Sequence, residues 1–253
     1  MKVMTGLLLL TLLSACSGQP TKPNIREYQI GAYLWQQTSG EYRALTYQAY
    51  NIAKEKIERE LENKHNRKRA VVFDIDETLL DNSYGGASEI KEGLSWKESH
   101  FADWVKLKKA VAIPGALDFI KFLVDRQVEV FYISNRRVEM YDDTMTNLVA
   151  QGFPVKKQNL MLMGNEHTKE PRRQEVLKKY DIVMLVGDNL TDFHQAFEKK
   201  SVAERNALVD QMRSEFGQRF IMLPNPLYGD WERALPADKT RIELLKDEPK
   251  LDL

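Results

Sequence analysis

The 253-residue chain has one cysteine, Cys16, and only four histidines. A single cysteine excludes an intrachain disulfide. His65, His100, His167 and His194 are too few for a binuclear site made of clustered histidine and aspartate ligands. None of them stands between an arginine and a glycine, as the nucleophile of a histidine phosphatase would. Both of those site types are therefore excluded.

An excess of charge of one sign is also missing. Lys and Arg together number 37, and so do Asp and Glu. A balanced net charge gives no indication of acidic partners, and no nucleic-acid polymer is expected as a partner. The class of partner must therefore be read from a site rather than from net charge.

The N-terminal stretch MKVMTGLLLLTLLSACSGQP has one lysine and then an apolar run that is short for a membrane span. We expect residues 1–15 to be a signal peptide. Leu13 to Cys16 resemble the bacterial lipobox, so Cys16 is expected to carry lipid, with residues 16–37 as a lipidated N-terminus and tether. The expected location is the bacterial cell envelope, with the chain held at an outer membrane or at the extracytoplasmic surface of the cell membrane.

Apolar runs and helical patterns alternate through the body of the chain. An amphipathic helix is expected over 38–63, and further helices over 115–126, 138–151 and 171–180. Apolar runs suited to strands occupy 71–75, 128–133, 182–186 and 220–223, with a short strand near 159–163. This alternation indicates an α/β fold with a parallel sheet. Residues 77–113 are too long for a simple connection and are expected to form a small helical cap, while 199–217 and the charged tail 237–253 are expected to be solvated.

Carboxylates follow two of the expected strands. Asp74 and Asp76 come at the end of the first run, and Asp188 and Asp192 follow the run at 182–186. Ligands of parallel sheets bind outside the carboxyl ends of the strands. Carboxylates from neighbouring strand ends can share one Mg²⁺, which would relieve their repulsion. An ionised aspartate can attack phosphorus, and a second carboxyl that holds a proton can serve as acid and then as base.

Ser134 and Asn135 end the expected strand at 128–133, and Lys169 precedes a helical pattern. A hydroxyl and backbone N–H groups can bind phosphate oxygens, and a lysine can neutralise phosphate and nucleophile together. A calcium loop is the alternative interpretation of DIDETLLDNSYG. It fails because Leu79 stands where glycine is required and Gly85 where a bidentate glutamate is required.

The segments FDIDETLL, ISN, a lysine and VGDNLTDF, in this order, resemble the haloacid dehalogenase superfamily of phosphotransferases. AVVFDIDETLLDNSYGG with VGDNLTDF further resembles the bacterial class C acid phosphatases, which are secreted and often lipid-anchored, and carry a signature of four aspartates. The similarity extends over most of residues 33–232. It implies a Rossmann-like parallel sheet flanked by helices, with a small cap, and a phosphatase domain over residues 38–236.

The resemblance also implies roles for individual residues. Asp74 would be the nucleophile, and Asp76 the general acid and base, whose backbone carbonyl also binds the metal. Asp188 would bind the metal, and Asp192 would hold metal-bound water or orient the lysine. The remaining matched positions are phosphate-binding Ser134, Asn135 and Lys169, and the substrate slot of Trp104 and Tyr228. Members of the family often carry more basic residues before this lysine than GNEHTKEPRR does, which leaves the roles of Arg172 and Arg173 open.

The function expected from residues and resemblance together is that of a Mg²⁺-dependent, or other divalent-cation-dependent, acid phosphatase. Its substrates would be small phosphomonoesters, including nucleoside monophosphates, so that 5′-nucleotidase activity is expected. Because Asp76 must be protonated in the first step, the optimum should lie on the acid side of neutral. A homodimer is a further expectation. Two alternatives stay open at this point: a surface lipoprotein that binds nucleotide, haem or a host molecule with little turnover, and a related phosphotransferase.

Overall fold

The computed structural model describes residues 26–246. The expected signal peptide, the lipidation site Cys16 and the last seven residues of the tail, 247–253, lie outside the described residues. Within the described part, no helix combines the length and the apolar character that a membrane span requires.

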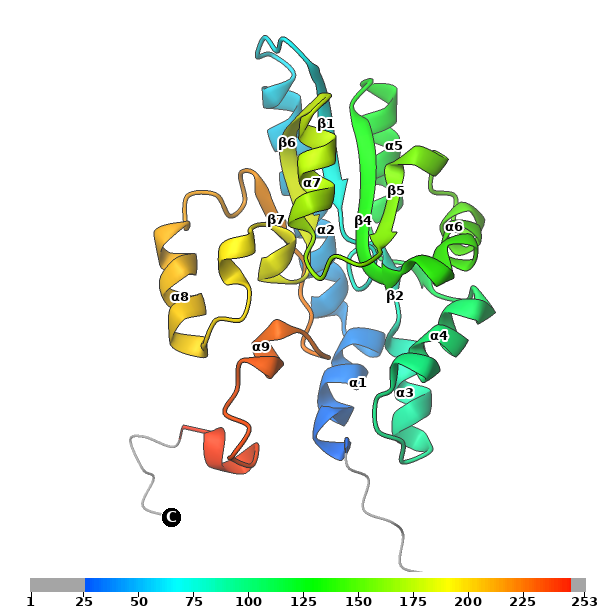
Figure 1. The fold of residues 1–253 in the computed structure, drawn as a ribbon, viewed down its shortest axis with the longest axis vertical. Coiled ribbons are helices and arrows are strands. Elements are labelled where there is room, and N and C mark those ends of the chain that lie inside the picture. Colours follow the sequence, from blue (N-terminus) through cyan, green and yellow to red (C-terminus); the bar gives the residue numbers. More distant parts are fainter. Residues whose placement is uncertain (1–25, 247–253) are drawn as a thin grey trace, which may run out of the picture.

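A five-stranded parallel sheet forms the centre of the molecule (Figure 1). Its strands are β1 (Lys68–Phe73), β4 (Glu129–Arg137), β5 (Leu160–Met163), β6 (Tyr180–Gly187) and β7 (Phe220–Met222), in the order β5-β4-β1-β6-β7. Each strand coincides with one of the expected apolar runs. The predicted fold class is therefore confirmed, and β1, which carries Asp74 and Asp76 beyond its end, lies in the middle of the sheet.

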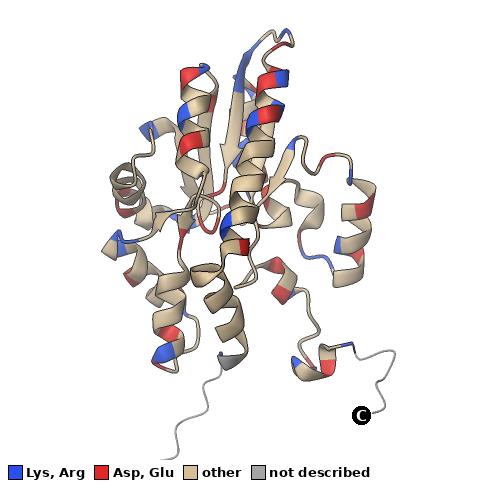
Figure 2. Cartoon of the chain, turned by 180° about the vertical axis from the view of Figure 1, so that it is seen from behind, with Lys and Arg blue, Asp and Glu red and all other residues tan. Residues whose placement is uncertain are grey.

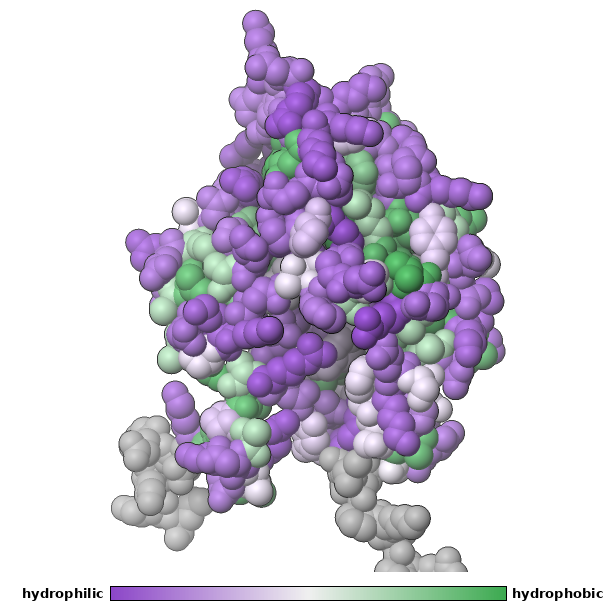
Figure 3. Space-filling model, viewed as in Figure 1, coloured by the Kyte–Doolittle hydropathy of each residue, from purple (hydrophilic) through white to green (hydrophobic). Residues whose placement is uncertain are grey.

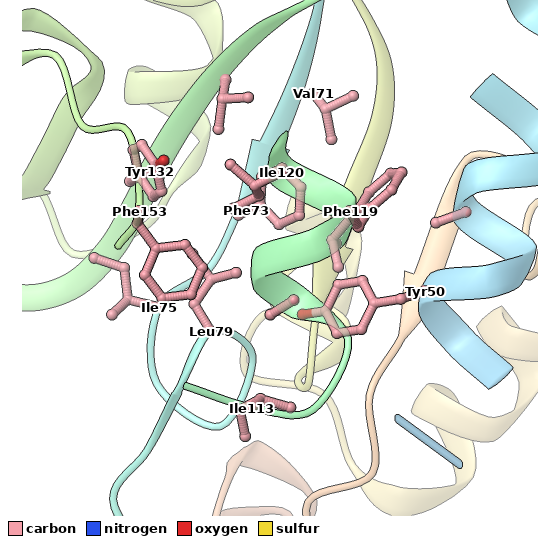
Figure 4. Packing of buried hydrophobic residues seen from close by; sticks show 14 of the residues in the cluster. Tyr50, Val71, Phe73, Ile75, Leu79, Ile113, Phe119, Ile120, Tyr132 and Phe153 are labelled. Atoms are coloured by element: carbon pink, nitrogen blue, oxygen red, sulfur yellow. The ribbon is translucent and has the colours of Figure 1, made fainter. Parts of the chain in front are cut away.

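Successive residues of β1 bury their side chains on opposite faces of the sheet. Val71 and Phe73 join the larger core with α2 (Gly40–Glu60), α5 (Ala116–Asp125) and α6 (Tyr141–Ala150), whereas Ala70 and Val72 join a second core with α7 (Glu170–Leu177). Figure 4 shows Phe73 in the larger core, where its ring contacts Phe119 edge-to-face at 5.9 Å. Because helices cover both faces, the apolar runs could be nearly continuous rather than alternating.

The insertion 77–113 forms the expected cap. The short antiparallel strands β2 (Leu80–Asp81) and β3 (Val111–Ala112) lead into and out of it, and α3 (Ser83–Lys91) and α4 (Glu98–Leu107) lie between them. Two glycines of α3 allow close packing. A Cβ on Gly85 would lie 2.7 Å from the ring of Trp104, and one on Gly86 would lie 2.1 Å from the hydroxyl of Tyr33. The cap is thus built around contacts that a larger residue would prevent.

The prediction of a tether over residues 16–37 is wrong for the part that the structure describes. Within it, the described residues 26–37 fold as η1 (Glu27–Gln29) and most of α1 (Ile30–Thr38), which packs on α3. The physical reason is that Tyr33 and Gln36 are buried, and Gln36 donates a 2.9 Å hydrogen bond to Asp81 at the base of the cap. The helix expected over 38–63 is α2. It begins after Ser39, whose side chain accepts from the backbone N–H of Tyr42 at 3.0 Å.

The remaining elements are helices outside the sheet and the cap. They are α8 (Val202–Gln211), α9 (Asp230–Arg233), η2 (Val138–Met140), η3 (Lys157–Asn159), η4 (Leu190–Asp192), η5 (Gln195–Phe197) and η6 (Ile242–Leu244). Seen from behind in Figure 2, charges of both signs are interspersed over the helices, in keeping with the balanced composition. The face in Figure 3 is mostly hydrophilic, with apolar residues in small separate areas.

Candidate active site

Three aspartates meet at the carboxyl edge of the sheet. Asp74 follows β1, Asp188 follows β6, and Asp192 ends η4. One carboxylate oxygen from each lies within 4.8 Å of the others. Asp74 is far in sequence from Asp188 and Asp192, and the neighbouring positions of β1 and β6 in the sheet bring it to them.

Lys169, directly before α7, completes this group. Its ammonium pairs with Asp192 at 2.6 Å and donates a hydrogen bond to Asp74. All three side chains are almost fully buried, so solvent weakens these interactions very little. The arrangement places one positive charge between two of the carboxylates.

Burial and crowding change the acidity of the group. Burial raises the pKa of Asp74 to about 7, although Lys169 lowers it in part and Asp192 adds to the rise. Burial, together with Asp192 and Asp74, also raises the pKa of Asp188 well above its usual range. Burial opposes the charge on Lys169, but Asp192 and Asp74 outweigh it and raise the pKa of Lys169. One lysine therefore leaves the three carboxylates short of positive charge.

The donor set fits a hard divalent cation. The cluster offers carboxylate oxygens, which are the ligands that Mg²⁺, Ca²⁺ and Mn²⁺ prefer. Asp188 is held in place by Thr78, which donates to Oδ1 at 3.1 Å, and by Asn225, which donates to Oδ2 at 2.8 Å. Such outer contacts orient the ligands of a metal site. Asp74, Asp188 and Asp192 could therefore hold a divalent cation.

The carboxylate of Asp76 points to a different set of partners. Arg136 binds its Oδ1 through both Nε, at 2.9 Å, and Nη2, at 2.8 Å. Asn82 donates to the same oxygen at 2.8 Å, and Ser134 donates to Oδ2 at 3.2 Å. Four aspartates were expected at a metal. The structure brings the carboxylates of Asp74, Asp188 and Asp192 together. The carboxylate of Asp76 is surrounded instead by neutral and positively charged hydrogen-bond donors.

Arg172 organises the segment expected to bind phosphate. Its guanidinium, only 6% exposed, donates to the backbone oxygen of Ser134, to Oδ1 of Asn135 at 2.8 Å and to the backbone oxygen of Thr168 at 3.1 Å. Thr168 immediately precedes Lys169. Arg172 therefore ties the strand-end serine and asparagine to the lysine loop, a role that sequence reasoning left open.

A pocket of about 800 Å³ opens above these groups and reaches Asp74, Asp76, Asp188 and Lys169. The two aromatics expected in a substrate slot, Trp104 and Tyr228, both line it. The indole N–H of Trp104 also donates a hydrogen bond to Oδ1 of Asn82 at 2.9 Å, which fixes the position of its ring. The structure therefore brings every described residue of the expected site to one pocket or its floor.

The pocket also contains residues that sequence reasoning missed. Arg26, Tyr28 and Gln29 line one wall, although they lie in the expected tether. Arg26 donates to Tyr33 at 3.0 Å and pairs with Glu89 of the cap, and Gln29 donates to the backbone oxygen of Leu227 at 2.8 Å. No short-range pattern signals this wall, because the contacts of Arg26 with Glu89 and of Gln29 with Leu227 join segments distant in sequence.

Arg136 was also missed, although the sequence contained a pattern that could have predicted its place in the site. Strand β4 extends past the expected end at Ile133 to Arg137, with an irregular register in between. Ser134 and Arg136 are buried in it while Asn135 is exposed. Alternation along the strand would have placed Arg136 on the same side as Ser134, and hence near Asp76.

Comparison with known proteins agrees with this site. The family described as HAD superfamily, subfamily IIIB (acid phosphatase), matches residues 14–231. The structure of the class C acid phosphatase from Bacillus anthracis is 39% identical, with a TM-score of 0.84, and the match covers 88% of this chain and 98% of that one. A structure of the Bacillus anthracis class C enzyme with tungstate bound is 40% identical, with a TM-score of 0.81, covering 87% and 94%. The chain therefore belongs to subfamily IIIB of the HAD superfamily, as an acid phosphatase of class C.

Proposed function

We propose that this acid phosphatase hydrolyses small phosphomonoesters through an aspartyl phosphate on Asp74, depends on a divalent cation, Mg²⁺ in the first instance, and acts at the bacterial cell envelope. The observation that carries the proposal is the buried contact of Lys169 with both Asp74 and Asp192, beside Asp188. A lone buried aspartate would be a poor nucleophile, because burial favours its neutral form. The charge of Lys169, together with that of a cation held by the aspartate cluster, would keep it ionised.

In the first step, a carboxylate oxygen of Asp74 attacks phosphorus and the ester P–O bond breaks. The Asp76 carboxyl gives its proton to the departing oxygen, so that an alcohol leaves rather than an alkoxide. Lys169 and the donors around Ser134 and Asn135 bind the phosphoryl oxygens, over which charge is spread in the transition state. A divalent cation held by Asp74, Asp188 and Asp192 would supply further neutralisation of this charge.

In the second step, Asp76, now ionised, takes a proton from water, and the oxygen of that water attacks phosphorus. The bond between phosphorus and Asp74 breaks, inorganic phosphate leaves, and Asp76 is protonated again. The donors on Asp76 suit this double role, since they hold the carboxyl in place in both charge states. The tungstate-bound relative supports binding of a tetrahedral oxyanion such as phosphate by this family.

The pocket supports a substrate larger than a bare phosphate. Its volume of about 800 Å³ lies in the range of pockets for small organic ligands. Trp104 and Tyr228 offer aromatic faces, and Arg26, Glu89 and Asp230 offer polar contacts of both signs. We therefore propose nucleoside monophosphates among the substrates, with the base on the aromatic side of the pocket.

The envelope location rests on the lipobox-like sequence that ends at Cys16. Cys16→Ser should move the protein from the membrane fraction to the soluble fraction and remove globomycin-sensitive processing. Ser17→Ala is the matched control, because it alters the next residue and keeps the cysteine. Continued membrane association of Cys16→Ser would show that another feature anchors the chain.

The enzymatic proposal is tested by phosphate release from p-nitrophenyl phosphate and from a nucleoside monophosphate, with and without chelator. We expect chelator to abolish both activities, Mg²⁺ to restore them, and Asp74→Asn to lower kcat by at least about a thousandfold. Asp118→Asn, an exposed acid of α5, is the control and should match wild type. Equal rates for Asp74→Asn and wild type would overturn the proposal.

A further inference from the structure

The two oxygens of the Asp76 carboxyl have unequal surroundings. Oδ1 accepts one hydrogen bond from Nε of Arg136 at 2.9 Å and one from Asn82 at 2.8 Å, and Nη2 of Arg136 lies 2.8 Å from the same oxygen as an ion-pair contact. Oδ2 accepts only from the hydroxyl of Ser134, at 3.2 Å. A carboxylate oxygen has two lone pairs, and these two hydrogen bonds use both of them on Oδ1, so they leave no room there for a proton. When Asp76 is protonated, the proton is therefore placed on Oδ2.

Arg136 is itself rigidly held. Its side chain is 1% exposed, its Nη1 donates to Thr144 of α6 at 3.1 Å, and its guanidinium lies 5.6 Å from the ring centre of Phe101 in the cap. A buried guanidinium is costly unless its donors are used. Here the sheet, the helix α6 and the cap all contribute to fixing one side chain, whose charge is directed at Asp76.

Asn82 is held just as firmly. Its backbone N–H donates to Glu77 at 2.8 Å, and its Oδ1 accepts from Trp104 at 2.9 Å. Glu77 is fully buried and has a left-handed backbone, with φ of 54°, which is strained for a residue other than glycine. Strain of this kind persists only where the surroundings impose it. The turn after Asp76 is thus shaped to bring Asn82 back to the carboxyl that precedes it.

We propose that Arg136 and Asn82 are positioning residues that occupy Oδ1 of Asp76 and so direct its proton, on Oδ2, to the leaving group. The proposal deepens the function given above and rests on Asp76 being the proton donor. It assigns a purpose to a buried cation that neither contacts the aspartate cluster nor is needed to neutralise it. A purely structural role, in which Arg136 only joins the cap to the sheet, is the competing interpretation.

The two interpretations differ in how the rate depends on the leaving group. p-Nitrophenolate is a stable anion and departs without a proton, whereas the alkoxide of benzyl alcohol requires one. p-Nitrophenyl phosphate and benzyl phosphate both carry one aromatic ring, so their contacts in the pocket are similar. The quantity to compare is kcat/KM, because it reports the steps up to transfer of phosphorus to Asp74, before Asp76 acts as base.

We expect Arg136→Gln to lower kcat/KM for benzyl phosphate at least about tenfold more than kcat/KM for p-nitrophenyl phosphate. This difference is smaller than the full contribution of a general acid to the rate, because the variant keeps Asp76 itself. Asn82→Ala should likewise lower the ratio of kcat/KM for benzyl phosphate to kcat/KM for p-nitrophenyl phosphate. Arg172→Gln is the matched control. It alters another buried arginine, one that contacts Ser134 and Asn135, and it should lower kcat/KM for both substrates by the same factor.

Asp76→Asn separates failure of this inference from failure of the proposed function. If Asp76→Asn leaves the ratio unchanged, Asp76 is not the proton donor and the mechanism proposed above is wrong. If Asp76→Asn shifts the ratio but Arg136→Gln and Asn82→Ala do not, the positioning role alone is overturned. If Arg136→Gln does not fold by near-ultraviolet circular dichroism, the ratio in Arg136→Lys and Asn82→Ala decides the matter by the same criterion.

Discussion

Gly187 and Asp192 lie so close together that a Cβ on the glycine would be 2.4 Å from Oδ2 of the aspartate. The same oxygen accepts from the backbone N–H of Asn189 at 2.9 Å, so the carboxylate cannot simply swing away. The absence of a side chain at the end of β6 thus allows Asp192 to fold back towards Lys169. The glycine in VGDN is therefore part of the construction of the site.

Gly187→Ala should displace Asp192 and break its contact with Lys169. A displacement of about 1 Å at such a site costs on the order of a hundredfold in rate, so we expect a loss of that size in kcat/KM for p-nitrophenyl phosphate. Gly40→Ala is the control, because nothing lies within 4 Å of its added Cβ. Wild-type activity in Gly187→Ala would show that the position of Asp192 is unimportant.

A divalent cation should stabilise the fold, and more so at neutral than at acid pH. Without a cation, the raised pKa of Asp74 means that stability is lost as the pH rises from the usual value of 3.8 to about 7. A cation offsets this loss, and at low pH protons compete with it. The rise in Tm on adding Mg²⁺ should therefore be larger near about pH 7.5 than near about pH 5. Asp188→Asn should reduce this rise in Tm at both pH values. An equal rise in Tm in the variant and in wild type would exclude Asp188 as a ligand of the cation.

His65 joins α2 to β6 at the end of the sheet away from the site. It contacts Asp181 at 3.0 Å and also pairs with Glu60. These carboxylates, Asp181 first, raise the pKa of His65 above its usual 6.5. A raised histidine pKa adds stability that is fully present below 6.5 and is lost as the pH rises through the higher value in the folded protein.

The free energy of unfolding of wild type should therefore exceed that of His65→Gln at about pH 5.5, and the difference should shrink by about pH 8.5. Urea unfolding at the two pH values measures it. The phosphatase activity of His65→Gln serves as the control for the intact site. A difference independent of pH would mean that His65 stabilises by packing alone.

The N-terminal wall of the pocket should contribute to substrate binding. Arg26 joins η1 to the cap through Glu89 and to α1 through Tyr33. Arg26→Gln should loosen this wall and raise KM for a nucleoside monophosphate about fivefold, the value of one net hydrogen bond, with little change in kcat. Arg43→Gln, which removes an exposed arginine that contacts only Tyr47 of its own helix, is the comparison. A fall in kcat without a change in KM would contradict a binding role.

How far the sequence predicts this molecule depends on the range of the interactions. Asp74 and Asp188 were predictable because each ends a buried apolar run, and parallel strands bring their ends to one edge. The ordered segment at Arg26 was not predictable, because it is held by contacts with distant segments, such as that of Arg26 with Glu89. The turn that returns Asn82 to Asp76 was not predictable either, because it depends on strained backbone at Glu77. Local patterns thus located the strand ends, while the pocket wall required the tertiary structure.

The central claim is that phosphorus passes through a covalent bond to Asp74. The most direct measurement is to quench the enzyme during turnover, reduce it with borohydride, and sequence the peptide from residues 70–86 by mass spectrometry. An aspartyl phosphate is reduced to homoserine, so homoserine should replace aspartate at position 74 and at no other aspartate of that peptide. Full turnover with unmodified Asp74, or homoserine at position 76 instead, would contradict the account.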